Sequence, residues 1–531
     1  MTDNLFQRLE ENTTRHPRKA AFVFKRGTKW ESFTFQQLFD LSERLARGLS
    51  AIGLHAGQRA ALMTPPSVDF FALAFALLKT GIIPVMVDPA IGLANVTACL
   101  KESKPEIFIG NTLTHAIRRL YGWGRETVKH NISIARVERL TFNVQRSAPF
   151  ATNSASSPAA IIYTSGSTGL PKGAIYTHEN FAAQLDMLSA AFDIQPDEID
   201  QPAFPLFALI DCLLGVTAVI PDMRFPPPAK VDSAKATDAI LRFNVTNMFA
   251  SPIMLDHLAD YATSSGYQLP SLKRIITAGA PAPVIVLEKS HKMLSSEARL
   301  FGIYGATESL PITVIDSKEI LNETRHLSAR RAGVCIGKPV DGACVRIIPI
   351  SDTAIWKWDD SLEMPTNEVG EITVKGRAVT QAYIGREEVN QLAKIDDRGE
   401  TIHRMGDLGY FDERGRLWYC GRKSHRVETA HGTFFTEQIE GIFNAHPLVY
   451  RTALVGVDGE PVLWVELESH AQNADKEIIK QELFELGKNH LQAVQVKTFL
   501  FAKIFPTDVR HNSKIIREKL ATLAVKLVGR Q

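Results

Sequence analysis

Residues 163–173, Tyr-Thr-Ser-Gly-Ser-Thr-Gly-Leu-Pro-Lys-Gly, are the segment of this chain best suited to binding phosphate. They follow the apolar run 159–162 and combine three glycines and four Ser or Thr hydroxyls with Lys172. Glycine lets the backbone approach an anion, hydroxyls donate hydrogen bonds, and lysine supplies a point charge. We therefore expect a phosphate-binding loop after a buried strand. A Gly/Ser linker is the alternative, and the spacing fits neither a Walker A loop nor a nucleophile elbow.

Two further segments place carboxylates beside glycines. In Tyr-Gly-Ala-Thr-Glu, Glu308 follows a strand-like apolar run, and an acidic residue there can hold Mg²⁺ against phosphate oxygens. A Thr-Glu pair could equally cap a helix. In Gly-Asp-Leu-Gly, Asp407 suits a ribose diol, although a turn aspartate is the alternative. Lys514, near the C-terminus, would by itself be a solvated surface residue.

The elements that must position these residues change in type along the chain. Alternating strands and helices over the first 300 residues predict parallel or mixed sheets covered by helices. Short strands and turns follow over 333–421, with a hairpin turn at 412–416, and then a small α+β unit. We expect strands at 60–63, 82–87, 107–110, 161–164, 275–278, 300–304, 453–457 and 462–467, and helices at 34–51, 69–79, 476–490 and 514–528. The fold class is α/β, or α+β over the whole chain, with domains at 1–422 and 423–531.

Composition restricts the class of protein. A length of 531 residues predicts at least two domains, and 45% hydrophobic with 22% charged residues is typical of a globular protein. A net charge of +2 does not predict a nucleic-acid partner. The five scattered cysteines fit neither zinc nor a disulfide framework, so we expect the reducing cytoplasm. The apolar segment 70–87 contains Lys, Gly and Pro, which predicts a buried helix, a turn and a strand, with no integral membrane segment.

In order, the loop, Gly-Ala-Thr-Glu-Ser, Gly-Asp-Leu, Gly-Arg and the terminal lysine resemble the adenylate-forming superfamily. This superfamily includes acyl-CoA synthetases, firefly luciferases and nonribosomal-peptide adenylation domains. The resemblance covers essentially the whole chain. It implies a large N-terminal domain with a small β-barrel-like subdomain, a small mobile C-terminal lid, and activation of a carboxylic acid by ATP and Mg²⁺.

The resemblance also implies roles for individual residues. The β,γ-phosphate loop would comprise Thr164, Ser165, Gly166, Ser167, Thr168, Gly169 and Lys172. The base would lie on Gly279, Ala280 and Pro281, near Tyr304. Thr307 would touch the α-phosphate, Glu308 would bind Mg²⁺, and the ribose would be held by Asp407 and Arg422. Lys514 would reach the carboxylate and the α-phosphate during adenylation.

Departures from the acyl-CoA synthetase pattern are similar to another branch of the superfamily. Ala208 follows Pro-Leu-Phe where histidine is usual, Ser424 occupies the hinge position, and the terminal motif 506–514 is unusually long. With segments 204–209 and 219–223, these features resemble the β-lactone synthetases of bacterial olefin biosynthesis. That resemblance implies adenylation of a long-chain β-hydroxy acid, commonly 2-alkyl-3-hydroxy, and its closure to a β-lactone with release of AMP and pyrophosphate. It also suggests association with other enzymes of such a pathway.

The second step would join the substrate's own hydroxyl to its activated carbonyl, so positioning dominates and a base could assist. We hypothesise His511 as that base, with His425 as the other candidate, although histidines near domain joints are more often structural. An apolar acyl pocket is expected between 204–223 and 249–280. Its candidate wall residues, which could equally be core, are Phe207, Leu209, Phe249 and Met254.

Two other functions remain open from the sequence. A long-chain acyl-CoA ligase would share the first half-reaction and use CoA in the second, and Gly432 lies where such enzymes thread pantetheine. A nucleotide-binding protein without catalysis is the other reading. The intact set Lys172, Glu308, Asp407, Arg422 and Lys514 argues against it.

Overall fold

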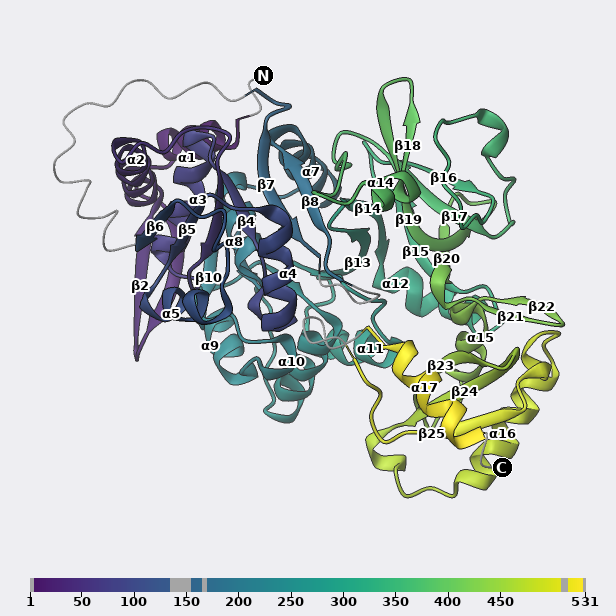
Figure 1. Cartoon of the computed structure of the whole chain (residues 1–531). Coiled ribbons are helices and arrows are strands. Elements are labelled where there is room, and N and C mark those ends of the chain that lie inside the picture. The colour runs from purple at the N-terminus through teal and green to yellow at the C-terminus, as the bar shows by residue number, and fades with distance from the viewer. Residues whose placement is uncertain (1–3, 134–153, 165–169, 508–513, 529–531) are drawn as a thin grey trace.

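The structure is a computed structural model that describes residues 4–133, 154–164, 170–507 and 514–528 (Figure 1). Its described strands form sheets of fourteen, six, three and two strands. The two largest sheets share one apolar core, to which Leu62 of the smaller sheet and Phe22 of the larger both belong. The predicted mixture of parallel and antiparallel sheets covered by helices is confirmed.

The six-stranded sheet carries the first part of the phosphate loop. Its order is β6-β5-β3-β4-β7-β8, parallel except for the last pair. The strands are β3 (Arg59–Met63), β4 (Ile83–Met86), β5 (Ile107–Gly110), β6 (His130–Ser133), β7 (Pro158–Tyr163) and β8 (Gly173–Thr177), with helices α3 (Val68–Thr80), α4 (Leu93–Ser103) and α5 (Thr112–Tyr121). β7 is apolar and almost entirely buried, as strands covered on both faces are. The predicted helix, turn and strand over 70–87 are α3 and β4.

The fourteen-stranded sheet begins with mostly parallel strands. Their order is β13-β12-β11-β9-β10-β1-β2. These strands are β1 (Ala20–Arg26), β2 (Lys29–Thr34), β9 (Ile199–Pro202), β10 (Thr217–Ile220), β11 (Asn247–Ala250), β12 (Arg274–Thr277) and β13 (Arg299–Ala306). The helices are α1 (Leu5–Arg15), α2 (Phe35–Ala51), α7 (His178–Phe192), α8 (Pro205–Leu214), α9 (Ser233–Phe243), α10 (Pro252–Ser264) and α11 (Val284–Met293). Helices α9 to α11 enclose a second apolar cluster against this sheet.

Antiparallel strands continue the same sheet. They are β14 (Ser309–Asp316), β15 (Val334–Pro339), β16 (Cys344–Ile348), β17 (Gly370–Lys375), β18 (Lys394–Asp397), β19 (Glu400–Phe411) and β20 (Leu417–Arg422), with helices α12 (Ser317–Glu319), α13 (Arg325–Ser328) and α14 (Glu387–Ala393). The predicted hairpin at 412–416 joins β19 to β20. β14 pairs with both β13 and β15, so the strands of the expected β-barrel-like subdomain continue the large sheet, and no pairing among the described strands closes a ring.

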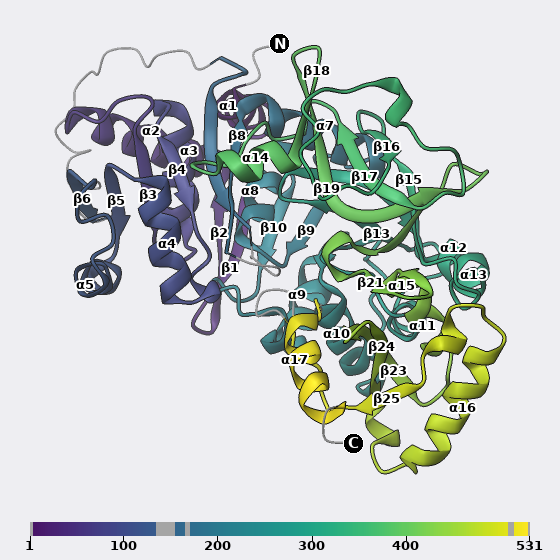
Figure 2. The same cartoon turned by 45° about the vertical axis from the view of Figure 1, so that its right-hand side comes forward.

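The C-terminal part has its own sheets and core (Figure 2). Its elements are β21 (Val427–Thr429), β22 (Gly432–Phe434), α15 (Thr436–Phe443), β23 (Val449–Val457), β24 (Glu460–Leu467), α16 (Lys476–Lys488), β25 (Thr498–Phe501) and α17 (Arg517–Val528). The last helix begins three residues later than predicted, because Ile515 first forms a β-bridge with Thr507. No helix in the described part of the chain combines the length and apolarity that crossing a membrane requires.

Candidate active site

Thr307 and Glu308 form the tight turn between β13 and β14, where Ala306 pairs with Ser309. The alternative that this pair caps a helix is therefore wrong. Glu308 is buried; the Tyr383 hydroxyl donates a hydrogen bond to its Oε1, and the Thr380 N–H donates to its carbonyl oxygen at 2.8 Å. Both the main chain and the side chain of Glu308 are thus held by one neighbouring segment.

Two lysines lie beside this buried carboxylate. The Nζ atoms of Lys172 and Lys394 lie 5.4 and 5.5 Å from the ring centroid of Tyr383, and both lysines interact electrostatically with Glu308. Burial lowers the pKa of Lys172, and it lowers that of Lys394 to about 7, while Glu308 opposes both shifts. Positive charge gathered around a single carboxylate favours a polyanionic ligand.

The stem of the phosphate loop is closed by two hydrogen bonds. The Thr164 N–H donates to the Lys172 carbonyl at 3.0 Å, and the Lys172 N–H donates to Thr164 Oγ1 at 3.2 Å. Arg386 donates to Glu102 of α4 and to the Pro171 carbonyl, which ties this stem to the six-stranded sheet. The remaining loop residues of the prediction, Ser165, Gly166, Ser167, Thr168 and Gly169, lie outside the described residues.

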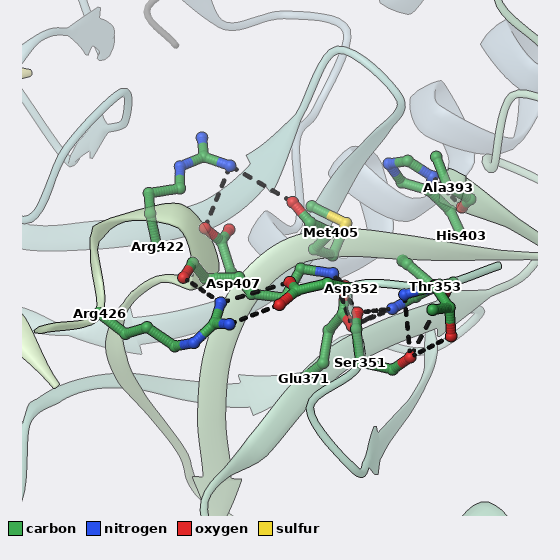
Figure 3. Close-up of polar contacts among 12 residues, drawn as sticks. Ser351, Asp352, Thr353, Glu371, Ala393, His403, Met405, Asp407, Arg422 and Arg426 are labelled. Atoms are coloured by element: carbon green, nitrogen blue, oxygen red, sulfur yellow. Dashed lines mark hydrogen bonds and ion pairs between the residues drawn. The ribbon is translucent and has the colours of Figure 1, made fainter. Parts of the chain in front are cut away.

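Asp407 and Arg422 are directly opposite each other on β19 and β20 (Figure 3). Arg422 Nη1 lies 3.1 Å from Asp407 Oδ1, and the Tyr304 hydroxyl donates to Asp407 Oδ2 at 2.6 Å. Burial raises the pKa of Asp407, and the charge of Arg422 opposes that shift most strongly. Oδ1 has no aligned hydrogen-bond donor among the described residues. It therefore retains the capacity to accept from a diol hydroxyl.

The glycine before Arg422 is required by the packing of α15 on β20. Gly421 has φ +126°, and a Cβ there would lie 2.2 Å from the Thr436 hydroxyl oxygen. Only glycine accommodates both the dihedral angle and the contact. This explains the Gly-Arg pair at the junction with the C-terminal part.

Lys514, from the C-terminal part, interacts electrostatically with Asp407. Its charge lowers the pKa of Asp407 against the effect of burial, so the two side chains lie within electrostatic range. The predicted base His511 lies outside the described residues. His425, the other candidate, has its Nε2 3.2 Å from Glu518 Oε1 of α17, and burial lowers its pKa to about 4. These contacts describe a histidine packed at the junction of the two parts.

The predicted adenine strip lies at the same sheet edge as Tyr304. Gly279, Ala280 and Pro281 follow β12, which pairs in parallel with β13 through Thr277 and Gly302. Gly279 and Ala280 are partly buried and Pro281 is exposed.

Of the predicted acyl-pocket residues, Phe207 and Phe249 stack with ring centroids 3.8 Å apart. Leu209 is buried in the apolar cluster that contains Phe249 and against which Phe207 packs. Met254 belongs to the other cluster, between the sheet and helices α9 to α11. The structure therefore brings three of these residues together and separates the fourth.

Sequence reasoning missed several residues around Glu308. Tyr383, Lys394 and Arg386 are described above, and His403 is opposite Lys394 on β19. His403 Nδ1 lies 3.0 Å from the Ala393 carbonyl, and burial lowers its pKa well below the ordinary value (Figure 3). Nδ1 therefore carries the proton and donates. The sequence signal that could have found them is the motif Tyr-Ile-Gly-Arg at 383–386. It contains no carboxylate flanked by glycines, which is the pattern that marked Asp407.

The site fits Mg²⁺ only if phosphate oxygens complete the coordination. Among the described residues, no group of three His, Cys, Asp or Glu could hold a metal. Mg²⁺ is commonly bound by one or two carboxylates with substrate phosphates. Glu308, buried beside two lysines, fits that arrangement.

The model of the family described as "AMP-binding enzyme" matches residues 9–384. The chain belongs to the AMP-binding enzyme family. Among its relatives, the "Olefin beta-lactone synthetase" of Xanthomonas campestris pv. campestris is 42% identical over 514 residues, covering 93% of this chain and 91% of that protein. The protein of the same name from Stenotrophomonas maltophilia is 40% identical, covering 92% and 91%.

Several solved structures share the fold of this chain. The structure of ATP-bound MatB from Rhodopseudomonas palustris has a TM-score of 0.80 and 19% identity, covering 99% of this chain and 100% of that one. O-succinylbenzoate Coenzyme A Synthetase from Bacillus subtilis, in complex with ATP and magnesium ion, has a TM-score of 0.76 and 21% identity, covering 97% and 98%. At these identities the likeness concerns the fold alone.

Proposed function

We propose that this AMP-binding enzyme is an ATP-dependent β-lactone synthetase acting on a long-chain 3-hydroxy acid, commonly with a 2-alkyl branch. The observation that carries the proposal is the 42% identity over 93% of the chain to an olefin beta-lactone synthetase. The convergence of Lys172, Glu308, Asp407 and Lys514, from the loop, the β13–β14 turn, β19 and the C-terminal part, supports it.

In the first step a substrate carboxylate oxygen attacks the α-phosphorus of ATP. The bond to the pyrophosphate oxygen breaks, and pyrophosphate leaves with the bonding pair. Lys172 would hold the β,γ-phosphates, Asp407 the ribose, and Lys514 would neutralise charge between the two anions that react. Glu308 would hold Mg²⁺, which when bound neutralises charge on the phosphate oxygens.

In the second step the substrate's 3-hydroxyl oxygen attacks the acyl carbonyl, AMP leaves with the carbonyl–oxygen bonding pair, and the hydroxyl proton passes to a base. Stacked Phe207 and Phe249 would line the acyl chain and limit its rotation. His511 remains the proposed base. Holding the hydroxyl against the carbonyl is the main task, because an intramolecular attack in a fixed geometry needs no external nucleophile.

We propose that the boundary between the nucleotide-binding domain and a rotating lid lies after Arg422, with residues 1–422 and 423–531 as the two domains. The proposal is supported by the separate core of the C-terminal sheets. We further propose that the enzyme works in the cytoplasm beside other enzymes of an olefin-forming pathway.

The experiment supplies a 2-alkyl-3-hydroxy fatty acid, ATP and Mg²⁺ without CoA and identifies the products by mass spectrometry. A β-lactone, AMP and pyrophosphate are expected in equal amounts. Turnover that begins only when CoA is added would instead identify an acyl-CoA ligase. Failure to release pyrophosphate from any carboxylic acid would indicate a nucleotide-binding protein without this activity.

A further inference from the structure

We propose that Lys394 is a positioning residue that fixes the carboxylate of Glu308. The inference rests on the proposed function, in which Glu308 holds Mg²⁺. Lys394 is the first residue of β18 and follows α14 directly. The sequence motifs give it no role, yet its ammonium lies beside the turn that carries Glu308.

The first link runs through the main chain of Glu308. Lys394 Nζ donates to the Thr380 carbonyl oxygen and lies 3.5 Å from Thr380 Oγ1. The Thr380 N–H in turn donates to the Glu308 carbonyl oxygen at 2.8 Å. One ammonium therefore holds the segment that fixes the backbone of the β13–β14 turn.

The second link runs through the side chain of Glu308. Lys394 Nζ lies 5.5 Å from the ring centroid of Tyr383, whose hydroxyl donates to Glu308 Oε1. The backbone of Tyr383 is held by Asn390 of α14, which accepts from its N–H at 2.7 Å and donates to its carbonyl at 3.0 Å. Helix α14, which holds the backbone of Tyr383, thus ends directly before Lys394, whose ammonium lies over the Tyr383 ring.

The position of Lys394 is itself fixed by neighbouring strands. Lys394 is opposite His403 in the β18–β19 pairing, and His403 Nδ1 donates to the carbonyl of Ala393 at 3.0 Å. The described hydrogen-bond acceptors of the ammonium are both on Thr380. The Lys394 ammonium is thus bonded to protein acceptors and would affect bound nucleotide through Glu308. Lys172 differs because it lies at the end of the phosphate-loop segment, where it would contact the phosphates directly.

The test compares the full-length enzyme with Lys394→Met, which keeps length and apolar stem but removes charge, and Lys394→Arg, which keeps charge. Lys375→Met is the matched control, because Lys375 lies on neighbouring β17 but pairs with Asp397 and Glu400. Calorimetry measures ATP binding at increasing Mg²⁺ without any acid, pyrophosphate release is measured over the same Mg²⁺ range, and thermal unfolding reports stability.

For Lys394→Met we expect the Mg²⁺ concentration at half-maximal ATP binding and pyrophosphate release to rise about tenfold, as when outer-shell partners of metal ligands are removed. Lys394→Arg should recover most of that loss, and Lys375→Met should not shift it. A half-saturating Mg²⁺ concentration unchanged in Lys394→Met would overturn the proposal, as would lower activity accompanied only by a lower melting temperature.

If Lys394→Met does not fold, Tyr383→Phe tests the same link, since it removes the hydroxyl that donates to Glu308. It should raise the Mg²⁺ requirement similarly, and an unchanged requirement would overturn the proposal. Binding of Mg²⁺ and ATP without pyrophosphate release from any acid would refute the proposed function while leaving the Lys394 test intact. Binding of ATP that is independent of Mg²⁺ would refute the inference about Lys394.

Discussion

Two buried glutamates in the antiparallel region each face two cations, and they differ in how those cations are satisfied. Glu371 of β17 is bound by Arg404 at 2.6 Å and by Lys423 at 3.1 Å, with the Glu371 and Arg404 side chains each 1% exposed. Arg404 also donates to the carbonyls of Ser351 and Thr353, and Lys423 donates to the carbonyl of Ser351. The cations of this cluster are bonded to protein acceptors.

Around Glu308 the two cations differ: Lys394 donates to the Thr380 carbonyl, whereas Lys172 has a different set of contacts. The described contacts of Lys172 Nζ are the face of Tyr383 and the field of Glu308, with no hydrogen-bond acceptor among the described residues. A buried carboxylate with two cations therefore does not by itself indicate a ligand-binding site. The stronger indication is a buried donor, such as Lys172 Nζ, for which the described residues supply no acceptor, because buried donors need partners.

The largest effect on stability is expected in the cluster of Glu371, Arg404 and Lys423. Glu371→Gln should lower the free energy of unfolding by about 3–5 kcal/mol, because it leaves two cations buried without their counter-charge. Urea unfolding measures this change. The Mg²⁺ requirement of the folded fraction should not move. A loss of stability below about 1 kcal/mol, as for exposed pairs, would mean that the carbonyl contacts alone satisfy Arg404 and Lys423.

The second effect is on the rate of adenylation and leaves the free energy of unfolding unchanged. Lys514→Ala should slow acid-dependent pyrophosphate release by about 10²–10³-fold, as when one donor to developing charge is removed. The control is Lys519→Ala, because Lys519 is the third residue of α17 and its side chain is exposed. Pyrophosphate release with saturating acid and ATP measures both variants. Equal rates for Lys514→Ala and the unaltered enzyme would exclude a role of Lys514 in adenylation.

A smaller effect, on the affinity for ATP, is expected at the proposed ribose site. Asp407→Asn keeps the shape of the side chain but removes the charge facing Arg422, so ATP binding should weaken by about 1.5–3 kcal/mol, the range for hydrogen bonds to charged groups. Calorimetric titration with ATP measures the change. An unaltered affinity for ATP with a lower free energy of unfolding would mean that Asp407, like Glu371, stabilises the fold and does not bind nucleotide.

The sequence predicted residues that motifs mark and missed those that long-range pairing creates. Glu308, Asp407 and Lys514 could be named because the motifs that contain them, in this order along the chain, resemble the adenylate-forming superfamily. Lys394 reads as an ordinary lysine after a short helix, and its burial arises only when β18 pairs with β19.

One pair of buried carboxyl groups is compensated by protons instead of by cations. Asp200 of β9 and Asp211 of α8 are both buried, and their carboxyl groups interact electrostatically. Burial raises the pKa of Asp200 to about 7 and that of Asp211 well above its ordinary value. The native state therefore keeps protons that the unfolded chain loses near pH 4. Stability should therefore fall as pH rises from about 4 to about 7.

Asp211→Asn should weaken this dependence, because asparagine retains a donor toward Asp200 without titrating. The variant should resemble the unaltered enzyme near pH 4 and be the more stable of the two at pH 8, with the control Asp40→Asn, at an exposed position, showing no such difference. Urea unfolding at pH 5, 6, 7 and 8 measures the slopes. Parallel slopes would mean that Asp211 is already ionised in the native state at pH 7. The cluster would then depend on the nearby Arg274 for compensation, as Glu371 depends on Arg404.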